Sequence, residues 1–288
     1  MTRRVIDCGG RPLDISRPAV MGILNITPDS FSDGGDFVAR DDALARARAM
    51  VAEGADIIDI GGESTRPGAE DVPVDEELAR VVPVVEALAG ELPVPLSVDT
   101  TKPEVMRAVA GAGAGLINDV MALQRPGAVV AAADTGLPVC LMHMQGTPRN
   151  MQRDPHYDDI VDDVARFLRE RVDGCVAGGV PRERLILDPG FGFGKRHEHN
   201  AGLLRRLAEL TGGDLPVLVG LSRKSFIGEL VDRPPKERVA GSIAAAVLAA
   251  AAGARIIRVH DVAATVDALK VVNSVAAPDD GVPEAANG

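Results

Sequence analysis

Eight short apolar segments alternate with eight longer segments of helical pattern along this chain of 288 residues. The short segments are rich in Val, Ile and Leu without polar–apolar alternation, which is typical of strands buried on both faces of a parallel sheet. We predict strands at 19–24, 57–60, 94–98, 116–117, 139–142, 185–187, 217–221 and 256–259. We predict helices at 41–53, 75–89, 102–112, 127–134, 157–177, 199–210, 236–252 and 262–274. Eight successive strand–helix pairs predict the α/β class and, within it, a (β/α)₈ TIM barrel.

The domain organisation predicted from this pattern is a single barrel over residues 1–275. A doubly wound open sheet is the competing arrangement, but the count reaches eight and no Gly-x-Gly-x-x-Gly motif follows the first strand. Residues 1–18 are predicted to form a short N-terminal β-hairpin that closes the bottom of the barrel. The segment 276–288 is rich in Pro, Gly and Asp, and we expect a disordered tail there.

The composition limits the classes of partner. The 31 basic and 42 acidic residues give a formal net charge of 31 − 42 = −11, and only 2% of the residues are aromatic. This excludes the basic surface and the stacking platforms of nucleic-acid-binding proteins. The three cysteines have no zinc-ligand spacing, and no segment resembles a signal peptide or a membrane span. We expect a soluble cytoplasmic protein in which any anion is bound by local positive charge.

Polar side chains stand at or near the carboxyl ends of the predicted strands. In a barrel these ends meet on one face, where active sites lie. The residues are Asn25, Asp59, Asp99, Asn118, Asp119, His143, Asp188, Lys224, Arg258 and His260. A strand-end aspartate is often only a helix N-cap, and this interpretation suits Asp59, Asp119 and Asp261. Capping alone does not explain polar residues at all eight ends, so the sequence predicts a ligand site.

Two kinds of chemistry are present in this set. Asp99, Asn118 and Asp188 suit a flat heterocycle with a guanidine-like edge, because a carboxylate accepts two parallel N–H bonds. Three other residues supply positive charge and donors that suit a phosphate or diphosphate. They are Lys224, Arg258 and His260. A Schiff-base role for Lys224 and a structural role for His260 stay open at this point.

Two predicted loops on the same face are unusually long. Residues 26–40 and 61–74 exceed the usual two to six residues of such connections and are rich in Gly, Ser, Thr, Pro and Asp. They are either surface decoration or a lid that closes over substrates.

Eight motifs in order resemble the dihydropteroate synthase family. They are MGILNITPDSFSDGG (21–35), DIGGESTRPGA (59–69), SVDT (97–100), IND (117–119), LMHMQG (141–146), LDPGFGFGK (187–195), SRKS (222–225) and IRVHD (257–261). The resemblance covers residues 20–272 and implies a (β/α)₈ transferase of folate biosynthesis. Such enzymes join 6-hydroxymethyl-7,8-dihydropterin diphosphate to 4-aminobenzoate and release diphosphate.

The resemblance also implies roles for individual residues. The implied pterin contacts are Asp99, Asn118, Met142, Asp188, Phe193, Gly220 and Lys224. The implied diphosphate contacts are Asn25, Arg258 and His260, with Asn25 as a Mg²⁺ ligand. The implied aminobenzoate contacts are Phe31, Asp33, Thr65, Arg66, Pro67 and Ser225. The implied catalytic residues are Asp99, Asn118, Asp188, Lys224 and Arg258.

Partners follow from the same resemblance: the two substrates, sulfonamide inhibitors that mimic aminobenzoate, and a second copy of the chain. The Ala-rich segment 243–252 suits a dimer contact, but equally a contact with the barrel. The expected mechanism is dissociative: diphosphate leaves first, and the aromatic amine then attacks a cation that the aspartates stabilise. The alternatives are a pterin-binding methyltransferase domain, a non-catalytic paralogue and a Schiff-base aldolase that uses Lys224. The first would not need the SRKS anion cluster.

Overall fold

Eight parallel strands form one sheet in the order β8-β7-β6-β5-β4-β3-β10-β9. The computed structural model describes residues 5–26, 35–65, 68–69 and 71–276, without the side chains of residues 35–39 and 276. A bridge between Leu187 and Val217 brings β8 beside β9, so that the sheet closes on itself. The strands are β3 (Ala19–Asn25), β4 (Ile57–Gly61), β5 (Leu96–Asp99), β6 (Leu116–Asp119), β7 (Val139–Met142), β8 (Leu185–Asp188), β9 (Leu218–Val219) and β10 (Ile256–Val259). The predicted (β/α)₈ barrel is confirmed.

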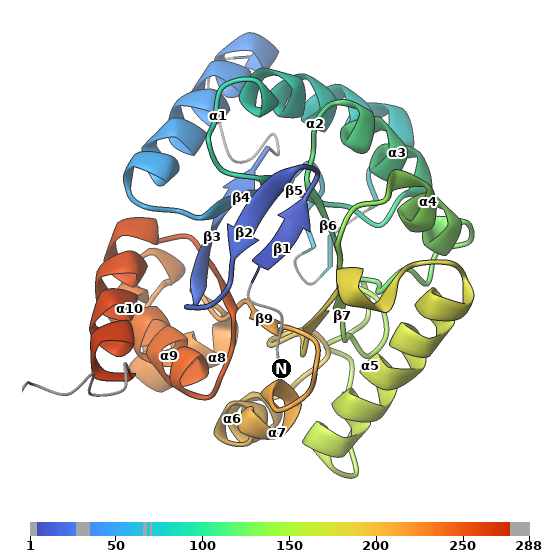
Figure 1. Cartoon of the computed structure of the whole chain (residues 1–288). Coiled ribbons are helices and arrows are strands. Elements are labelled where there is room, and N and C mark those ends of the chain that lie inside the picture. The colour runs from blue at the N-terminus through green and yellow to red at the C-terminus, as the bar shows by residue number, and fades with distance from the viewer. Residues whose placement is uncertain (1–4, 27–34, 66–67, 70, 277–288) are drawn as a thin grey trace, which may run out of the picture.

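Helices surround the strands as a ring (Figure 1). They are α1 (Gly35–Ala52), α2 (Val74–Ala89), α3 (Pro103–Gly111), α4 (Ala128–Thr135), α5 (Ile160–Ala177), α6 (His197–Arg205), α7 (Ala208–Thr211), α8 (Ser225–Val231), α9 (Val239–Ala251) and α10 (Val262–Ala276). Short 3₁₀ turns span Arg182–Arg184 and Pro235–Glu237. The predicted helix 199–210 is two helices, and α8 was not predicted. Helix α10 ends one residue inside the predicted tail, whose other residues, 277–288, lie outside the described part of the chain.

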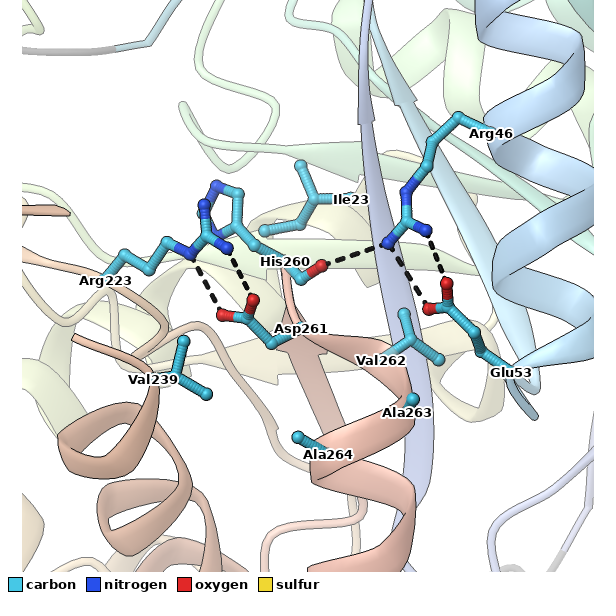
Figure 2. A pocket seen from close by; sticks show the side chains of 10 residues that line it. All are labelled: Ile23, Arg46, Glu53, Arg223, Val239, His260, Asp261, Val262, Ala263 and Ala264. Carbon is cyan, nitrogen blue, oxygen red and sulfur yellow. Dashed lines mark hydrogen bonds and ion pairs between the residues drawn. The ribbon is translucent and has the colours of Figure 1, made fainter. Parts of the chain in front are cut away.

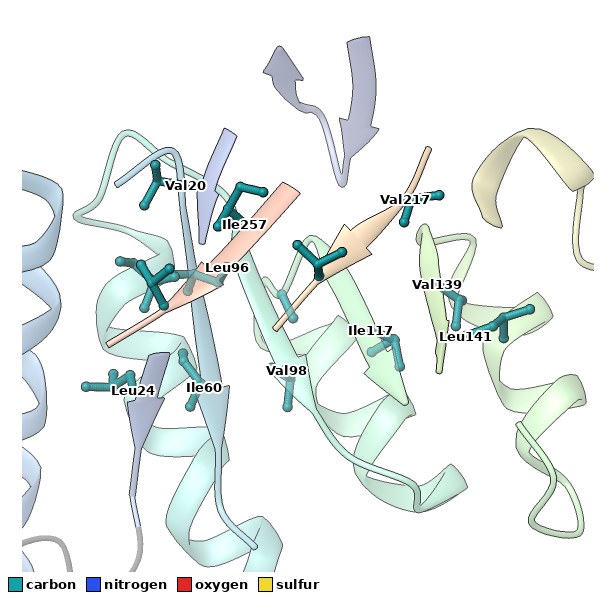
Figure 3. Close-up of a cluster of buried hydrophobic side chains, with 14 of the residues drawn as sticks. Val20, Leu24, Ile60, Leu96, Val98, Ile117, Val139, Leu141, Val217 and Ile257 are labelled. Atoms are coloured by element: carbon teal, nitrogen blue, oxygen red, sulfur yellow. The ribbon is translucent and has the colours of Figure 1, made fainter. Parts of the chain in front are cut away.

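The strands separate two buried apolar clusters, because successive side chains of a strand point to opposite faces. The outward side chains pack against the helices. Figure 3 shows this cluster, with Val20 on β3, Ile60 on β4, Val98 on β5 and Ile257 on β10. The inward cluster holds one residue from each of six strands: Ile57, Leu116, Cys140, Ile186, Leu218 and Ile256. The barrel is therefore filled with apolar side chains toward the amino ends of its strands.

The N-terminal hairpin closes this apolar end, as predicted. β1 (Val5–Cys8) pairs antiparallel with β2 (Arg11–Asp14), and Figure 1 shows the hairpin crossing in front of the strands. Ile6, Cys8 and Leu13 belong to the inward cluster. A Cβ atom on Gly115 would lie 2.5 Å from the carbonyl oxygen of Cys8, so the hairpin approaches β6 closely enough to require glycine there.

Leu13→Ala is expected to destabilise the protein by about 2–5 kcal/mol, the range for a buried leucine in a core that cannot collapse around the cavity. Leu13 is 2% exposed. The matched control is Val5→Ala in the same hairpin, where the side chain is 43% exposed and the expected change is about 0.5 kcal/mol. Urea unfolding measures both. Equal losses in the two variants would contradict a sealing role for the hairpin's inner face.

Candidate active site

The inward positions beyond the apolar layer carry polar side chains. On β4, β5, β6, β8 and β10 they are Asp59, Asp99, Asn118, Asp188 and Arg258. Strand register pairs Asp99 with Asn118, and Asp188 with Met142 of β7. The strand ends thus bring the residues predicted for the heterocycle together at the carboxyl end of the barrel.

Arg258 lies between two carboxylates. Its Nε donates to Oδ2 of Asp59 at 2.6 Å, and its Nη2 donates to Oδ2 of Asp99 at 3.1 Å. Asn118 donates through Nδ2 to the same Asp59 oxygen at 3.3 Å. Burial alone would lower the pKa of Arg258, but Asp59 and Asp99 raise it above its ordinary value. The guanidinium is thereby fixed in the barrel interior.

Negative charge is in excess at this end of the barrel. Burial raises the pKa of Asp99 to about 8, Arg258 opposes the shift, and Asp59 adds to it. Burial also raises the pKa of Asp188, which Lys224 opposes. Asp99 consequently holds a proton near neutral pH unless a ligand donates a hydrogen bond to its ionised form.

Lys224 completes the heterocycle end. Its Nζ donates to the carbonyl oxygen of Phe191 and lies 4.4 Å from the centroid of the Phe193 ring. Burial lowers the pKa of Lys224 to about 8, while Asp188 acts in the opposite direction. A Cβ atom on Gly220 would lie 3.8 Å from Lys224 Nζ, so the glycine leaves the ammonium accessible from β9.

His260 lies past the end of β10, beside Ser222. Ser222 Oγ accepts the backbone N–H of His260 at 3.2 Å and lies 3.1 Å from its Nδ1. His260 borders a pocket of about 530 Å³ that reaches from Ile23 to the first turn of α10 (Figure 2). None of the heterocycle-end carboxylates lines this pocket. In Figure 2, Arg223 pairs with Asp261 at one side, and Arg46 pairs with Glu53 at the other.

Asn25 ends β3 near the same region. A Cβ atom on Gly61 would lie 3.7 Å both from Asn25 Oδ1 and from Asp99 Cβ, so the three residues are neighbours. Within the described part of the chain, no group of three His, Cys, Asp or Glu side chains is arranged to hold a metal ion. Asn25 therefore offers one oxygen rather than a complete metal site.

The loop after β4 is anchored by a buried ion cluster. Glu63 accepts the N–H of Val72 through Oε1 at 2.8 Å and bonds Lys102 Nζ through Oε2 at 2.7 Å. Lys102 also pairs with the fully buried Glu77 of α2. These contacts close the base of the loop that carries Thr65, whose side chain is half-buried.

The remaining residues predicted for aminobenzoate are distributed as follows. Ser225 is the exposed first residue of α8. The other four, Phe31, Asp33, Arg66 and Pro67, lie outside the described residues.

Two predictions about strand-end residues were wrong. Asp59 was interpreted as a helix cap, but it points into the barrel and holds Arg258. His143 was grouped with the ligand site, but its ring packs against Phe167 and contacts the buried Lys195. The cap interpretation holds for Asp119, which accepts the N–H groups of residues 121 and 123. The inward position of Asp59 was missed because the residue lies two positions before the strand end, where only the strand register shows which face a side chain occupies.

The fold and these side chains define a protein of the (β/α)₈ enzyme class, with buried carboxylates at the carboxyl ends of its strands. Comparison with known families agrees, since residues 21–260 match the family described as pterin-binding enzymes. The chain therefore belongs to the pterin-binding enzyme family.

Relatives within this family match nearly the whole chain. Dihydropteroate synthase of Escherichia coli K12 is 58% identical over 265 residues, which are 92% of this chain and 94% of that protein. The solved Xanthomonas albilineans dihydropteroate synthase with 4-aminobenzoic acid has a TM-score of 0.91 and 56% identity, over 96% of this chain and 100% of that one. The Yersinia pestis enzyme in complex with a sulfonamide drug has a TM-score of 0.90 and 58% identity, over 94% and 98%. The activity of the chain is accordingly that of a dihydropteroate synthase, a transferase.

Proposed function

We propose that the carboxyl end of the barrel is divided into a pterin end, an anion end and an aminobenzoate loop. The reaction of dihydropteroate synthases replaces the diphosphate on the methylene of 6-hydroxymethyl-7,8-dihydropterin diphosphate by the amine of 4-aminobenzoate. The observation that carries the proposal is the set of buried Asp99, Asn118 and Asp188 with the half-buried Lys224, two carboxylates with an amide and an ammonium, at the end of the barrel. This set matches the donors and acceptors on the edge of a pterin.

At the pterin end, Asp188 and Asp99 accept N–H groups of the heterocycle, and Asn118 and Lys224 supply donors to its acceptors. The half-buried ring of Phe193 gives the pterin an apolar face beside Lys224. Met142, buried at the register position of Asp188, and Gly220 bound the same space. The low dielectric there strengthens each of these hydrogen bonds.

At the anion end, His260 and Arg258 receive the diphosphate. Asn25 would offer its side-chain oxygen to a Mg²⁺ ion, because Mg²⁺ prefers oxygen ligands and completes its shell with waters and substrate phosphates. A bound Mg²⁺ would neutralise charge on the leaving diphosphate.

The loop after β4 and the start of α8 receive the second substrate. Thr65 and Ser225 are the described members of the predicted aminobenzoate set, and the Glu63–Lys102 pair holds the base of that loop. A sulfonamide occupies the aminobenzoate position on this proposal, as the relative solved with such a drug suggests.

The chain's residues act by electrostatic stabilisation in a dissociative substitution. The methylene C–O bond breaks, its electron pair leaves with diphosphate, and the cation is delocalised into the pterin ring. Asp99 and Asp188 stabilise this cation, while Arg258 and His260 stabilise the departing charge. The amine nitrogen then forms the new C–N bond and loses its proton to solvent.

The proposal is tested by measuring diphosphate release from purified protein. Release should require both substrates and Mg²⁺, and His260→Gln should raise the KM for the diphosphate substrate about 10- to 100-fold, because a charge-assisted hydrogen bond is worth about 1.5–3 kcal/mol. His260 is the cleaner probe, since Arg258 also holds Asp59 and Asp99. Affinity for the pterin alcohol, which lacks diphosphate, is the control and should not change. Equal losses for the two ligands would refute the anion end.

Binding of the pterin alcohol at pH 7 should release close to one proton. Asp99, with its pKa of about 8, is mostly protonated in the free protein, and ligand N–H groups favour its ionised form and lower its pKa. The release should fall toward zero as the pH rises above 8. Calorimetry in buffers of different ionisation enthalpy measures it, with Asp99→Asn as the control that releases none. Proton release that persists in Asp99→Asn would assign the proton to another group.

We also propose a homodimer that forms through α9 and α10. Leu248 on α9 is 59% exposed, and Val271 and Val275 on α10 are 64% and 81% exposed, which makes an apolar surface on neighbouring helices. Sedimentation should find twice the chain mass for the wild type and a lower mass for Leu248→Asp. A Leu248→Asp protein that stays dimeric would place the interface elsewhere.

The compartment we propose is the cytoplasm. Cys8, Cys140 and Cys175 are all free and buried, as in proteins of reducing compartments, and cell fractionation tests this assignment. No helix in the described ranges has the length and apolar character needed to cross a membrane.

A further inference from the structure

Lys195 is a buried lysine without a carboxylate partner. It follows β8 by seven residues and is 3% exposed. Its Nζ lies 2.9 Å from Nδ1 of His143, 2.9 Å from the carbonyl oxygen of Gly190 and 3.1 Å from that of Phe193. Among the described residues, none offers it a carboxylate within ion-pair distance. A buried cation is costly unless it is hydrogen-bonded, so these three acceptors account for its presence.

The three shorter contacts match the three protons of an ammonium group, and the carbonyl oxygen of His143 lies further away, at 3.5 Å. Burial, with a smaller effect of Lys195, lowers the pKa of His143 to about 2, so the imidazole is neutral and its Nδ1 can accept. Burial also lowers the pKa of Lys195 itself. The ammonium donates to Nδ1 and to both carbonyl oxygens, whereas a neutral amine would donate to the carbonyls and accept from Nδ1–H of the other imidazole tautomer. In both forms the side chain holds the two carbonyl oxygens of the turn.

Two of the acceptors belong to the turn formed by residues 188–195, which folds around Lys195. Gly190 and Gly194 in this turn have φ angles of +68° and +59°. A Cβ atom on Gly190 would lie 1.9 Å from the carbonyl oxygen of His143, and one on Gly194 would lie 2.6 Å from that of Gln145. The glycines let the turn press against the segment after β7, and the ammonium joins the two segments.

The same turn orients two groups of the pterin end. The N–H of Gly190, whose carbonyl Lys195 holds, donates to Oδ1 of Asp188 at 2.7 Å. Phe191 accepts Lys224 Nζ through its carbonyl, and the Phe193 ring lies beside that ammonium. Each carbonyl held by Lys195 therefore belongs to a residue that contacts Asp188 or Lys224.

We propose that Lys195, together with His143, is a positioning residue of the transferase that holds the turn 188–195 so that Asp188 and Lys224 face the pterin. Lys195 does not touch substrate, and its effect is transmitted through the Gly190 and Phe193 carbonyls. The inference rests on the proposed assignment of Asp188 and Lys224 to the pterin.

Lys195→Met keeps an unbranched side chain that is one atom shorter and removes the N–H donors. The KM for the pterin diphosphate should rise about 10- to 100-fold, the size of effect that small misplacements of binding groups produce. The KM for aminobenzoate at saturating pterin diphosphate should stay within about twofold. The fall in pterin affinity at low pH, called the acid limb, should also move to higher pH. The charge of Lys195 lowers the pKa of Asp188, so its removal lets Asp188 take up a proton at higher pH. Steady-state kinetics and calorimetry across pH measure these effects.

The matched control is Tyr157→Phe. The Tyr157 hydroxyl donates to the carbonyl oxygen of Gly194 at 2.6 Å, so this variant removes one contact of the same turn but none to the residues that hold Asp188 or Lys224. Its melting temperature should fall, while the KM for pterin diphosphate and the acid limb should not move. A merely structural role for Lys195 would give Lys195→Met this same profile, and that result would overturn the proposal.

Two further variants keep the test decisive. If Lys195→Met does not fold, Lys195→Gln, which retains two donors and no charge, should show the shifted acid limb with a smaller rise in KM. Unchanged values in a folded Lys195→Gln protein would overturn the proposal. Asp188→Asn tests the underlying assignment separately. If that variant binds the pterin alcohol as tightly as the wild type, the pterin end itself is misassigned, whatever Lys195 does.

Discussion

The site depends on a charge imbalance inside the barrel. Asp59, Asp99 and Asp188 share the carboxyl end with Arg258 and Lys224, so three acidic groups face two basic ones in a space with little water. Burial penalises the charged form of Asp99, and the neighbouring Asp59 adds to this effect, so the pKa of Asp99 rises to about 8 and one proton stays in the group. On the proposed assignment, a heterocycle that brings N–H donors to these carboxylates relieves the excess, and this favours binding of a pterin edge.

The fold separates these charged side chains from the apolar half of the barrel. The inward residues at the amino ends of the strands, such as Ile57 and Leu218, pack with the hairpin residue Leu13 and exclude water from that end of the barrel. Two residues further along β4, the same face carries Asp59. The inward face of the barrel is thus apolar at one end and polar at the other, because inward positions recur every second residue along each strand.

Periodicity predicted the barrel well, because eight runs of apolar residues leave few other closed sheets. It predicted the direction of individual side chains less well. Asn118 and Asp119 are consecutive, yet Asn118 points inward to Asp59 and Asp119 outward to cap a turn. Only the register with β5 decides between them. Likewise, the contact of His143 with Lys195 joins residues 52 positions apart, and no local sequence pattern predicts it. Helix α8 was not predicted, because it has only seven residues and a glycine at its centre.

The acidic net charge of −11 matters little for binding an anionic substrate, because the field that the substrate meets is set locally. Yet the local cations are not free, because Arg258 donates to both Asp59 and Asp99. On the proposed assignment, a pterin that donates to Asp99 competes with Arg258 for the same carboxylate. The guanidinium then has a nitrogen available for the diphosphate of the same molecule. Binding at the two ends is therefore coupled through Asp99, so the affinities of ligands that each fill one end do not simply add up to the affinity of a ligand that fills both.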